Sequence, residues 1–248
     1  MIKIIPAKDR HFNDFGWLKT YWLFSFSDYF DPENIQFGAL RVFNDDVVAP
    51  GQGFGTHPHQ EMEIVTIVFR GEVTHEDSMG NKAVIKAGDV QRMSAGTGIT
   101  HSEFNFGSEP AYFCQIWILP DVSKLKPSYE QKAFSFEASE TGLLPLVSGK
   151  RLPETVGIHT DVTFFRGNLK AGEDLDYSMQ ENRRVFAYVT DGTMDVNGNH
   201  LNTHDQARID LEENLKFKGM SHAEFLLIDV PSCKGWGYDP HTLKGVKR

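Results

Sequence analysis

The sequence predicts an all-β protein, either a sandwich or a barrel. Short apolar or alternating runs of strand length recur along the 248 residues, and they are rich in Val, Ile, Phe and Tyr. Turn-forming residues separate these runs, and long helical periodicity is nearly absent. Many closely spaced strands with little helix are typical of sandwiches and barrels. The clearest runs cover residues 38–43, 64–69, 113–119 and 225–230, with turn signals at 45–46, 79–81, 87–89 and 197–199.

The composition is that of an ordinary globular chain and excludes several classes of function. Hydrophobic residues make up 40% and charged residues 24%, and 34 Asp and Glu outnumber 25 Lys and Arg, so that the net charge is −9. This sign disfavours direct binding to nucleic acids or to anionic membranes. Two cysteines, Cys114 and Cys233, can form at most one disulfide, which indicates a reducing compartment. Because no apolar leader or membrane span is evident, we expect a cytoplasmic protein.

A weak internal repeat predicts two domains. The run IVTIVFRG at 64–71 resembles VFAYVTDG at 185–192, and the segments that follow each run, AGDVQRMS with FCQIWIL and HDQARID with EFLLIDV, also match loosely. Two stacked copies of one small β-barrel would explain the repeat. Residues 120–153 are rich in Pro, Gly, Ser and Lys, and we interpret them as the crossover. We therefore expect an N-terminal domain over residues 1–130 and a C-terminal domain over 131–248.

Histidines and acidic residues at alternate positions mark a candidate metal site in the first half. Residues two apart on a strand point to the same face, so His57 and His59 can chelate one ion. Glu61 and Glu63 continue this face, either as ligands or as partners that orient the imidazoles.

A second set of residues repeats this alternation after a glycine-rich turn. His101, Glu103 and Asn105 share one face, and both sets converge if the two strands face each other. A single histidine is more often a surface or hydrogen-bonded residue, and His200 and His204 stay unassigned. The positions in the second half that match the first set hold Ser178, Gln180 and Arg184, so we expect no metal site there. No metal role is expected for His11, His75, His159, His222 and His241.

These motifs resemble the two cupin motifs, and the longer segments around them resemble the pirin family, especially bacterial pirin-like proteins. The segments GWLKTYWLFSFSDYFDP, THPHQEMEIVTIVFRGEVTHEDSMGN and MSAGTGITHSEFN carry the resemblance, which covers most of residues 1–120 closely and the rest in outline. It implies a bicupin fold, in which two antiparallel, jelly-roll-like β-barrels pack face to face. It also implies one metal ion in the N-terminal barrel. Carried over by position, the ligands are His57, His59, His101 and Glu103, and Glu63 becomes a neighbour.

The resemblance also implies a chemistry. Three imidazoles and one carboxylate bind a divalent first-row ion and leave positions open for a substrate and dioxygen. The resemblance favours iron(II), zinc fits by ligand type, and manganese, nickel, cobalt and copper stay open. The implied activity is that of a quercetin 2,3-dioxygenase, an oxidoreductase that opens the ring of a flavonol or a similar enol-containing aromatic. In this hypothesis Glu103 is both a ligand and the catalytic base.

Aromatic residues flank the expected ligands. Phe54, Phe104 and Phe106 could line a pocket for an aromatic substrate or could belong to the core. A second hypothesis is a non-enzymatic, metal- and redox-responsive regulator of the pirin type, whose surface a protein partner reads. The acidic charge argues against direct DNA contact but allows docking on a basic protein. Turnover of a flavonol separates the two hypotheses.

Overall fold

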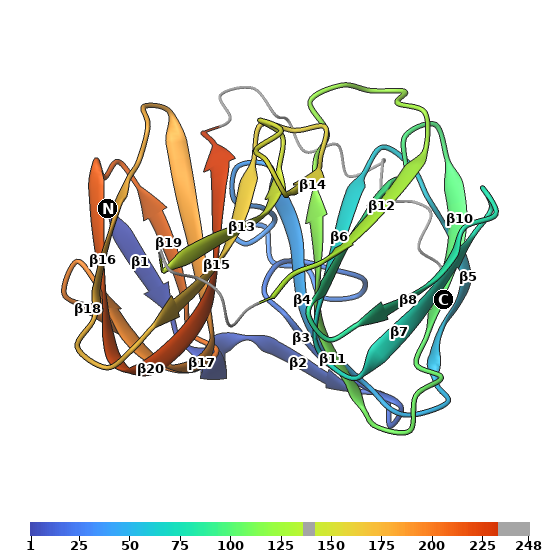
Figure 1. The fold of residues 1–248 in the computed structure, drawn as a ribbon, viewed down its shortest axis with the longest axis horizontal. Coiled ribbons are helices and arrows are strands. Elements are labelled where there is room, and N and C mark those ends of the chain that lie inside the picture. The colour runs from blue at the N-terminus through green and yellow to red at the C-terminus, as the bar shows by residue number, and fades with distance from the viewer. Residues whose placement is uncertain (136–141, 233–248) are drawn as a thin grey trace. The chain divides into compact units, whose positions relative to one another are not determined.

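The structure is a computed structural model and describes residues 1–135 and 142–232. The chain divides into two compact units, and nearly all of their regular structure is antiparallel β-strand (Figure 1). Among the described residues, no helix has the length and apolar character needed to cross a membrane. The site unit contains His11–Phe134 and Val156–Thr160, and the second unit contains Met1–Arg10 with the described parts of Ser135–Thr155 and Asp161–Lys234.

Two antiparallel sheets build the site unit. The larger sheet runs in the order β12-β9-β6-β11-β4-β3-β2, and the smaller one in the order β5-β10-β7-β8 (Figure 1). Glu103 of β10 accepts a hydrogen bond from Gln115 of β11, so the two sheets face each other at this point. The strands are β2 (His11–Asp14), β3 (Leu18–Trp22), β4 (Leu40–Val48), β5 (Gly53–His59), β6 (Glu63–Arg70), β7 (Glu72–Asp77), β8 (Lys82–Lys86), β9 (Asp89–Ser94), β10 (Ile99–Phe104), β11 (Ala111–Ile118), β12 (Ser128–Ala133) and the short β14 (Val156–Gly157).

The second unit is built around one large antiparallel sheet. Its strands follow the order β1-β19-β17-β20-β15-β13, with β16 beside β20 and β18 beside β17. A single turn of 3₁₀-helix, η1 (Ala7–Asp9), follows the first strand. The strands are β1 (Ile2–Ile5), β13 (Leu143–Ser148), β15 (Thr163–Leu169), β16 (Asp174–Ser178), β17 (Arg183–Val196), β18 (Asn199–Leu201), β19 (Gln206–Asp210) and β20 (Asn214–Pro231).

The all-β prediction is confirmed, but the expected barrels are not closed. Each sheet has edge strands, such as β12 and β2 in the larger sheet of the site unit, so the strands form open, facing sheets. The expected face-to-face packing and the domain bounds at residues 130 and 131 stay predictions. The first strand, β1, pairs with β19, which places the N-terminal residues in the second unit.

The internal repeat seen in the sequence corresponds to a repeated strand order. In the site unit, β6 lies between β9 and β11, and β4 follows β11. In the second unit, β17 lies between β19 and β20, and β15 follows β20. The matched runs at 64–71 and 185–192 fall on β6 and β17, so the two halves share a topology as the repeat predicted.

One local expectation is wrong. The aspartates at 45–46 do not form a turn but lie inside β4, where both are buried because this strand is covered on both of its faces. The crossover expected at 120–153 includes the step from one unit to the other between Phe134 and Ser135, and it also contains β12 and β13. The other three turn signals and the four strand-like runs are confirmed.

Two of the apolar clusters in the described part of the site unit lie on either side of its polar interior. One contains Val48, Val68 and Phe113, and the other contains Ile64 and Trp117. Between them lies a line of buried polar residues on adjacent strands, directly opposite one another in register. We call this line the polar row: Gln91 on β9, Thr66 on β6, Gln115 on β11 and Asn44 on β4.

Candidate metal centre

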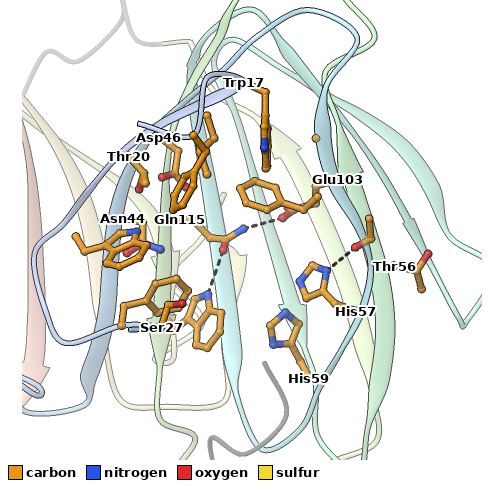
Figure 2. Close-up of a pocket in the computed structure, with 18 residues that line it drawn as sticks. Trp17, Thr20, Ser27, Asn44, Asp46, Thr56, His57, His59, Glu103 and Gln115 are labelled. Atoms are coloured by element: carbon orange, nitrogen blue, oxygen red, sulfur yellow. Dashed lines mark hydrogen bonds between the residues drawn. The ribbon is translucent and has the colours of Figure 1, made fainter. Parts of the chain in front are cut away.

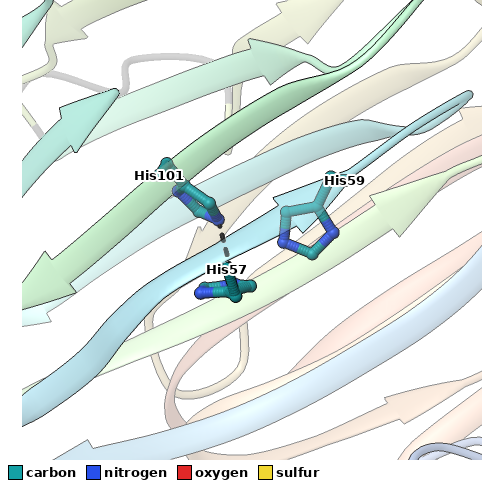
Figure 3. Close-up of side chains that lie close together, drawn as sticks. All are labelled: His57, His59 and His101. Carbon is teal, nitrogen blue, oxygen red and sulfur yellow. Dashed lines mark hydrogen bonds between the residues drawn. The ribbon is translucent and has the colours of Figure 1, made fainter. Parts of the chain in front are cut away.

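Strands β5 and β10 bring three histidines together. The strands are antiparallel neighbours, and their register sets His101 directly opposite His57, with His59 two residues further along β5. The Nε2 atoms of His57 and His101 lie 3.1 Å apart, and the three ring centroids are separated by 4.5 to 4.9 Å (Figure 3). The predicted convergence of these imidazoles is therefore present in the structure.

The turn before β10 sets this register and depends on glycine. Gly96 has a φ of +45°, and an added Cβ would lie 1.9 Å from the carbonyl oxygen of Leu125. Any side chain at this position would therefore collide with the backbone. The turn allows β10 to begin at Ile99 opposite His59, which carries His101 to its place opposite His57.

The protonation of His59 and His101 suits a metal ion. Burial, reinforced by the neighbouring His57, lowers the pKa of His59 to about 3. Burial and the three nearby histidines also place the pKa of His101 far below its ordinary value. Neutral imidazoles present free lone pairs, which is the form that binds metals.

The geometry of the rings also fits one ion. His57 donates its Nδ1–H to the carbonyl oxygen of Gly55 at 2.8 Å, so that its Nε2 carries the lone pair. Two imidazole nitrogens bound at right angles to one ion at about 2.1 Å lie about 3.0 Å apart. The observed separation of 3.1 Å between Nε2 of His57 and Nε2 of His101 matches this value. One ligand nitrogen from each of His57, His59 and His101 lies within 4.8 Å of the others.

Glu103 is buried beside this group but has its own partners. Its Oε2 accepts a hydrogen bond from Gln115 Nε2 at 2.7 Å, and its Oε1 lies 3.5 Å from the Thr66 hydroxyl. A carboxylate oxygen of Glu103 lies within 4.8 Å of nitrogens of His75 and His101, but it does not join the group of His57 and His59. Its role as fourth ligand stays a prediction.

Sequence reasoning missed a buried pair behind His101. His75 Nδ1 lies 3.5 Å from His101 Nδ1, and His75 Nε2 lies 3.1 Å from Asp77 Oδ2. Burial opposes ionisation of Asp77, yet hydrogen bonds from Asn81 and His75 hold its pKa below the ordinary value, so it is a carboxylate. Such a carboxylate–histidine chain orients His101 and leaves its Nε2 free for an ion. The alternate spacing of His75 and Asp77 was the sequence signal for this pair.

The two further acidic candidates, Glu61 and Glu63, do not lie beside His57, His59 and His101. Glu63 is buried on β6, where it accepts a hydrogen bond from Ser94 Oγ at 3.0 Å and lies 3.4 Å from His159 Nδ1. Glu61 lies between β5 and β6, and its carboxylate accepts the backbone N–H of Lys124 at 2.9 Å. Neither joins the histidine groups among the described residues.

The remaining histidines have other neighbours. His11 stacks on Tyr29, His200 pairs with Asp195, and His204 stacks on Tyr188. Cys114 is buried. Cys233 and His241 lie outside the described residues.

A cavity of about 490 Å³ opens beside His57, His59 and Glu103 (Figure 2). It lies between the two sheets of the site unit, and its wall is rich in aromatic rings. Phe54 lines it because β5 carries an irregularity between His57 and Phe54, which turns Phe54 to the same side as Glu103. The other aromatic residues in the wall are Phe15, Trp17, Trp22, Phe26 and Trp117.

Phe104 and Phe106 are placed elsewhere. The two rings stack on each other with centroids 5.5 Å apart, Phe106 is largely exposed, and neither ring lines the cavity. Alternation along β10 explains this, since Phe104 points away from the face that carries His101 and Glu103.

Two family models match the chain. The model described as Pirin matches residues 6–118, which include β5 and β10. The model described as the quercetinase C-terminal cupin domain matches residues 146–230, which lie mostly in the second unit. Together they cover both halves of the sequence repeat.

Relatives cover nearly the whole chain. Quercetin 2,3-dioxygenase of Escherichia coli (strain K12) is 41% identical over 232 residues, which are 93% of this chain and 99% of the relative. A pirin-like protein of Caulobacter vibrioides is 42% identical over 218 residues, with 88% and 94% coverage. A crystal structure of the bacterial pirin YhhW from Escherichia coli with nickel(II) matches with a TM-score of 0.89 at 40% identity, covering 94% of this chain and 100% of that one. Similarity of this extent shows that the chain belongs to the pirin family.

Proposed function

We propose that this protein is a dioxygenase that uses one divalent metal ion, iron(II), to open the ring of a flavonol or a similar enol-containing aromatic. The observation that carries the proposal is the convergence of His57, His59 and His101 beside a cavity of about 490 Å³. A cavity of this size accepts a small organic ligand. Relatives named quercetin 2,3-dioxygenase support the choice of substrate class.

In this proposal the three imidazoles hold the ion, and Glu103 completes the ligand set. When bound, the ion supplies Lewis acidity and brings the substrate and dioxygen together. Three neutral imidazoles with a carboxylate are a donor set that suits iron(II). The nickel(II) complex of the related bacterial pirin supports a divalent ion in this fold.

Glu103 is also the proposed base for the enol hydroxyl of the substrate. Gln115 donates to Glu103 Oε2 and thereby holds the carboxylate in one orientation. Gln115 is itself fixed, because Trp117 donates its Nε1–H to the amide oxygen at 3.3 Å. Among the described residues, Oε1 of Glu103 has the Thr66 hydroxyl, 3.5 Å away, as its hydrogen-bond partner, so in this proposal it is the oxygen that takes the proton.

The aromatic wall selects the shape of the substrate. Trp17 packs edge-to-face on Phe54 with centroids 5.2 Å apart, and Phe26 packs in the same way on Trp117 at 5.4 Å. Such rings present flat apolar surfaces to an aromatic ligand and exclude water from the reacting end.

The experiment is to give quercetin, under air, to purified protein loaded with iron(II) and to follow the loss of flavonol absorbance. His59→Ala should abolish turnover, because one of the three imidazoles is lost. His222→Ala, at an exposed histidine of the second unit, is the matched control and should turn over quercetin at the wild-type rate. If the wild-type protein is no faster than His59→Ala, the dioxygenase proposal fails for this substrate and the regulator hypothesis gains.

A further inference from the structure

Three polar side chains line the cavity on the larger sheet, on the side away from the imidazoles. They are Thr20 on β3 and Asn44 and Asp46 on β4 (Figure 2). Each residue is at most 3% exposed. The Thr20 hydroxyl serves the Asp46 carboxyl as a side-chain hydrogen-bond partner, whereas among the described residues Asn44 Oδ1 and Asp46 Oδ1 have none. Buried polar atoms are nearly always paired, so two unpaired oxygens on one wall require an explanation.

The strand register gathers these residues on one face. Thr20 lies directly opposite Asp46 in the antiparallel pair β3–β4, and Asn44 is two residues from Asp46, so all three point to the same side. The neighbour of Asn44 on the next strand is Gln115. The Gln115 amide bonds to Glu103 and Trp117, and Asn44 Oδ1 has no hydrogen bond to it.

The polar atoms of this wall determine the chemistry of the group that would bind it. Asn44 offers a carbonyl oxygen, which only accepts hydrogen bonds, and the Thr20 hydroxyl both donates and accepts. Burial raises the pKa of Asp46 to about 8, so at neutral pH it carries a proton and also donates and accepts. A group that can satisfy such a wall must itself both donate and accept, as a phenolic hydroxyl does.

We propose that Thr20, Asn44 and Asp46 form a subsite that binds a phenolic hydroxyl of the substrate, remote from the end held at the imidazoles. The inference rests on the proposed function for the identity of the reaction, but the subsite itself is tested by ligand binding alone. It narrows the substrate class from enol-containing aromatics to those with a hydroxyl on the opposite part of the molecule. The aromatic rings between the two polar regions then hold the apolar body of the ligand.

The test compares two ligands that differ only in their hydroxyls. Quercetin and 3-hydroxyflavone share the same enol, but the latter lacks quercetin's other hydroxyls. Binding is measured under anaerobic conditions by quenching of tryptophan fluorescence, since Trp17, Trp22 and Trp117 line the cavity. The wild-type protein should bind quercetin about 10-fold or more tightly than 3-hydroxyflavone.

Isosteric variants assign this preference to the wall. Thr20→Val and Asn44→Leu should each lower the ratio of the two affinities about 2- to 10-fold and leave 3-hydroxyflavone binding unchanged. Asp46→Asn keeps a donor and an acceptor and should retain the preference. Thr193→Val makes the same change as Thr20→Val in the second unit and should leave both affinities at the wild-type values.

A stability measurement distinguishes a binding role from a structural one. Because Asn44 Oδ1 is buried without a partner among the described residues, Asn44→Leu should raise the melting temperature of the ligand-free protein by about 1 to 3 °C while weakening quercetin binding. Equal affinity of the wild type for both flavonols, absence of binding, or equal losses for both ligands in the variants would overturn the subsite. Absence of turnover alone would contradict the dioxygenase proposal, because the affinity ratio does not depend on turnover.

Discussion

The same position in the two repeated sheets is polar in one unit and apolar in the other. In the site unit, the polar row crosses four strands as Gln91, Thr66, Gln115 and Asn44. In the second unit, the strands in equivalent order carry, in the same register, Ala207, Ala187, Leu227 and Phe165. Among the described residues, the row of the second unit therefore belongs to a continuous apolar cluster, whereas the row of the site unit separates two apolar clusters and borders a cavity.

The difference shows how one topology serves two purposes. An interior of apolar side chains gains stability from burial and close packing. A row of buried polar side chains gives up part of that stability, because several of its atoms have no partner. The polar row instead provides side chains that can orient other groups. Gln115, for example, donates a hydrogen bond to Glu103.

The largest expected effect is the loss of a metal ion that we expect in the site unit and not in the second unit. Protein purified without chelator should contain about one ion per chain, and His101→Ala should lose it together with all measurable flavonol turnover. The loss of metal affinity should exceed the 10- to 100-fold loss that is typical when a residue that orients a ligand is removed. Elemental analysis measures it, with His222→Ala as control. Two ions per chain would show that the second unit also binds metal.

The choice of carboxylate is tested in the same assay. Glu103→Ala should lower the metal content, while Glu63→Ala should keep it, because Glu63 is paired with Ser94 and His159 rather than with the imidazoles. The reverse result would make Glu63 the ligand.

The buried acid of the cavity should make the stability of the site unit depend on pH. Burial raises the pKa of Asp46 from 3.8 to about 8, the nearby Asp45 and Glu103 add to this, and a hydrogen bond with Thr20 opposes it. Below about pH 4 both folded and unfolded forms hold the proton, so there is no penalty. Between pH 4 and 8 the unfolded chain loses its proton while the folded protein keeps it, so stability falls as the pH rises.

The variant Asp46→Asn removes this dependence. Its free energy of unfolding relative to wild type should rise from near zero at pH 4 to a plateau above pH 8, of at most about 6 kcal/mol. Urea denaturation at a series of pH values measures the difference. A difference that is constant over this range would mean that Asp46 is ionised in the folded protein.

Exchanging one residue of each row should have opposite effects in the two units. Leu227→Gln places an amide in the apolar interior of the second unit and should lower the free energy of unfolding by about 2 to 4 kcal/mol. Gln91→Leu removes an amide whose two polar atoms have no partner and should raise it by about 1 kcal/mol. Chemical denaturation measures both. A destabilised Gln91→Leu would show that the polar row contributes to stability.

The smallest effect on the site concerns the pair behind His101. His75→Ala should weaken metal binding about 10- to 100-fold without removing a ligand, because His101 loses the partner that orients it. Competition with a chelator measures the affinity. The matched control is His200→Ala, which removes a histidine paired with Asp195 in the second unit and should leave affinity unchanged. Unchanged affinity in His75→Ala would mean that β10 alone positions His101.

Much of the fold was predictable because strand alternation and turns are local properties. The period-two pattern of His57 and His59, and of His101 and Glu103, determined which residues share a face of β5 and β10. The repeat also predicted that β6 and β17 have equivalent neighbours. The aspartates at 45–46 were wrongly interpreted as a turn. Aspartate is common in turns, but it also occurs inside strands where its side chain lines a cavity, as Asp46 does.

The sequence by itself determined the strand content, the repeat and the histidines that could chelate an ion, because these follow from spacing along one strand. Only the tertiary structure decided which distant strands meet. Facing of the two sheets brought Gln115 to Glu103, pairing of β7 with β10 brought His75 behind His101, and pairing of β3 with β4 set Thr20 opposite Asp46. These contacts join residues from different strands, and no pattern within a single strand encodes them.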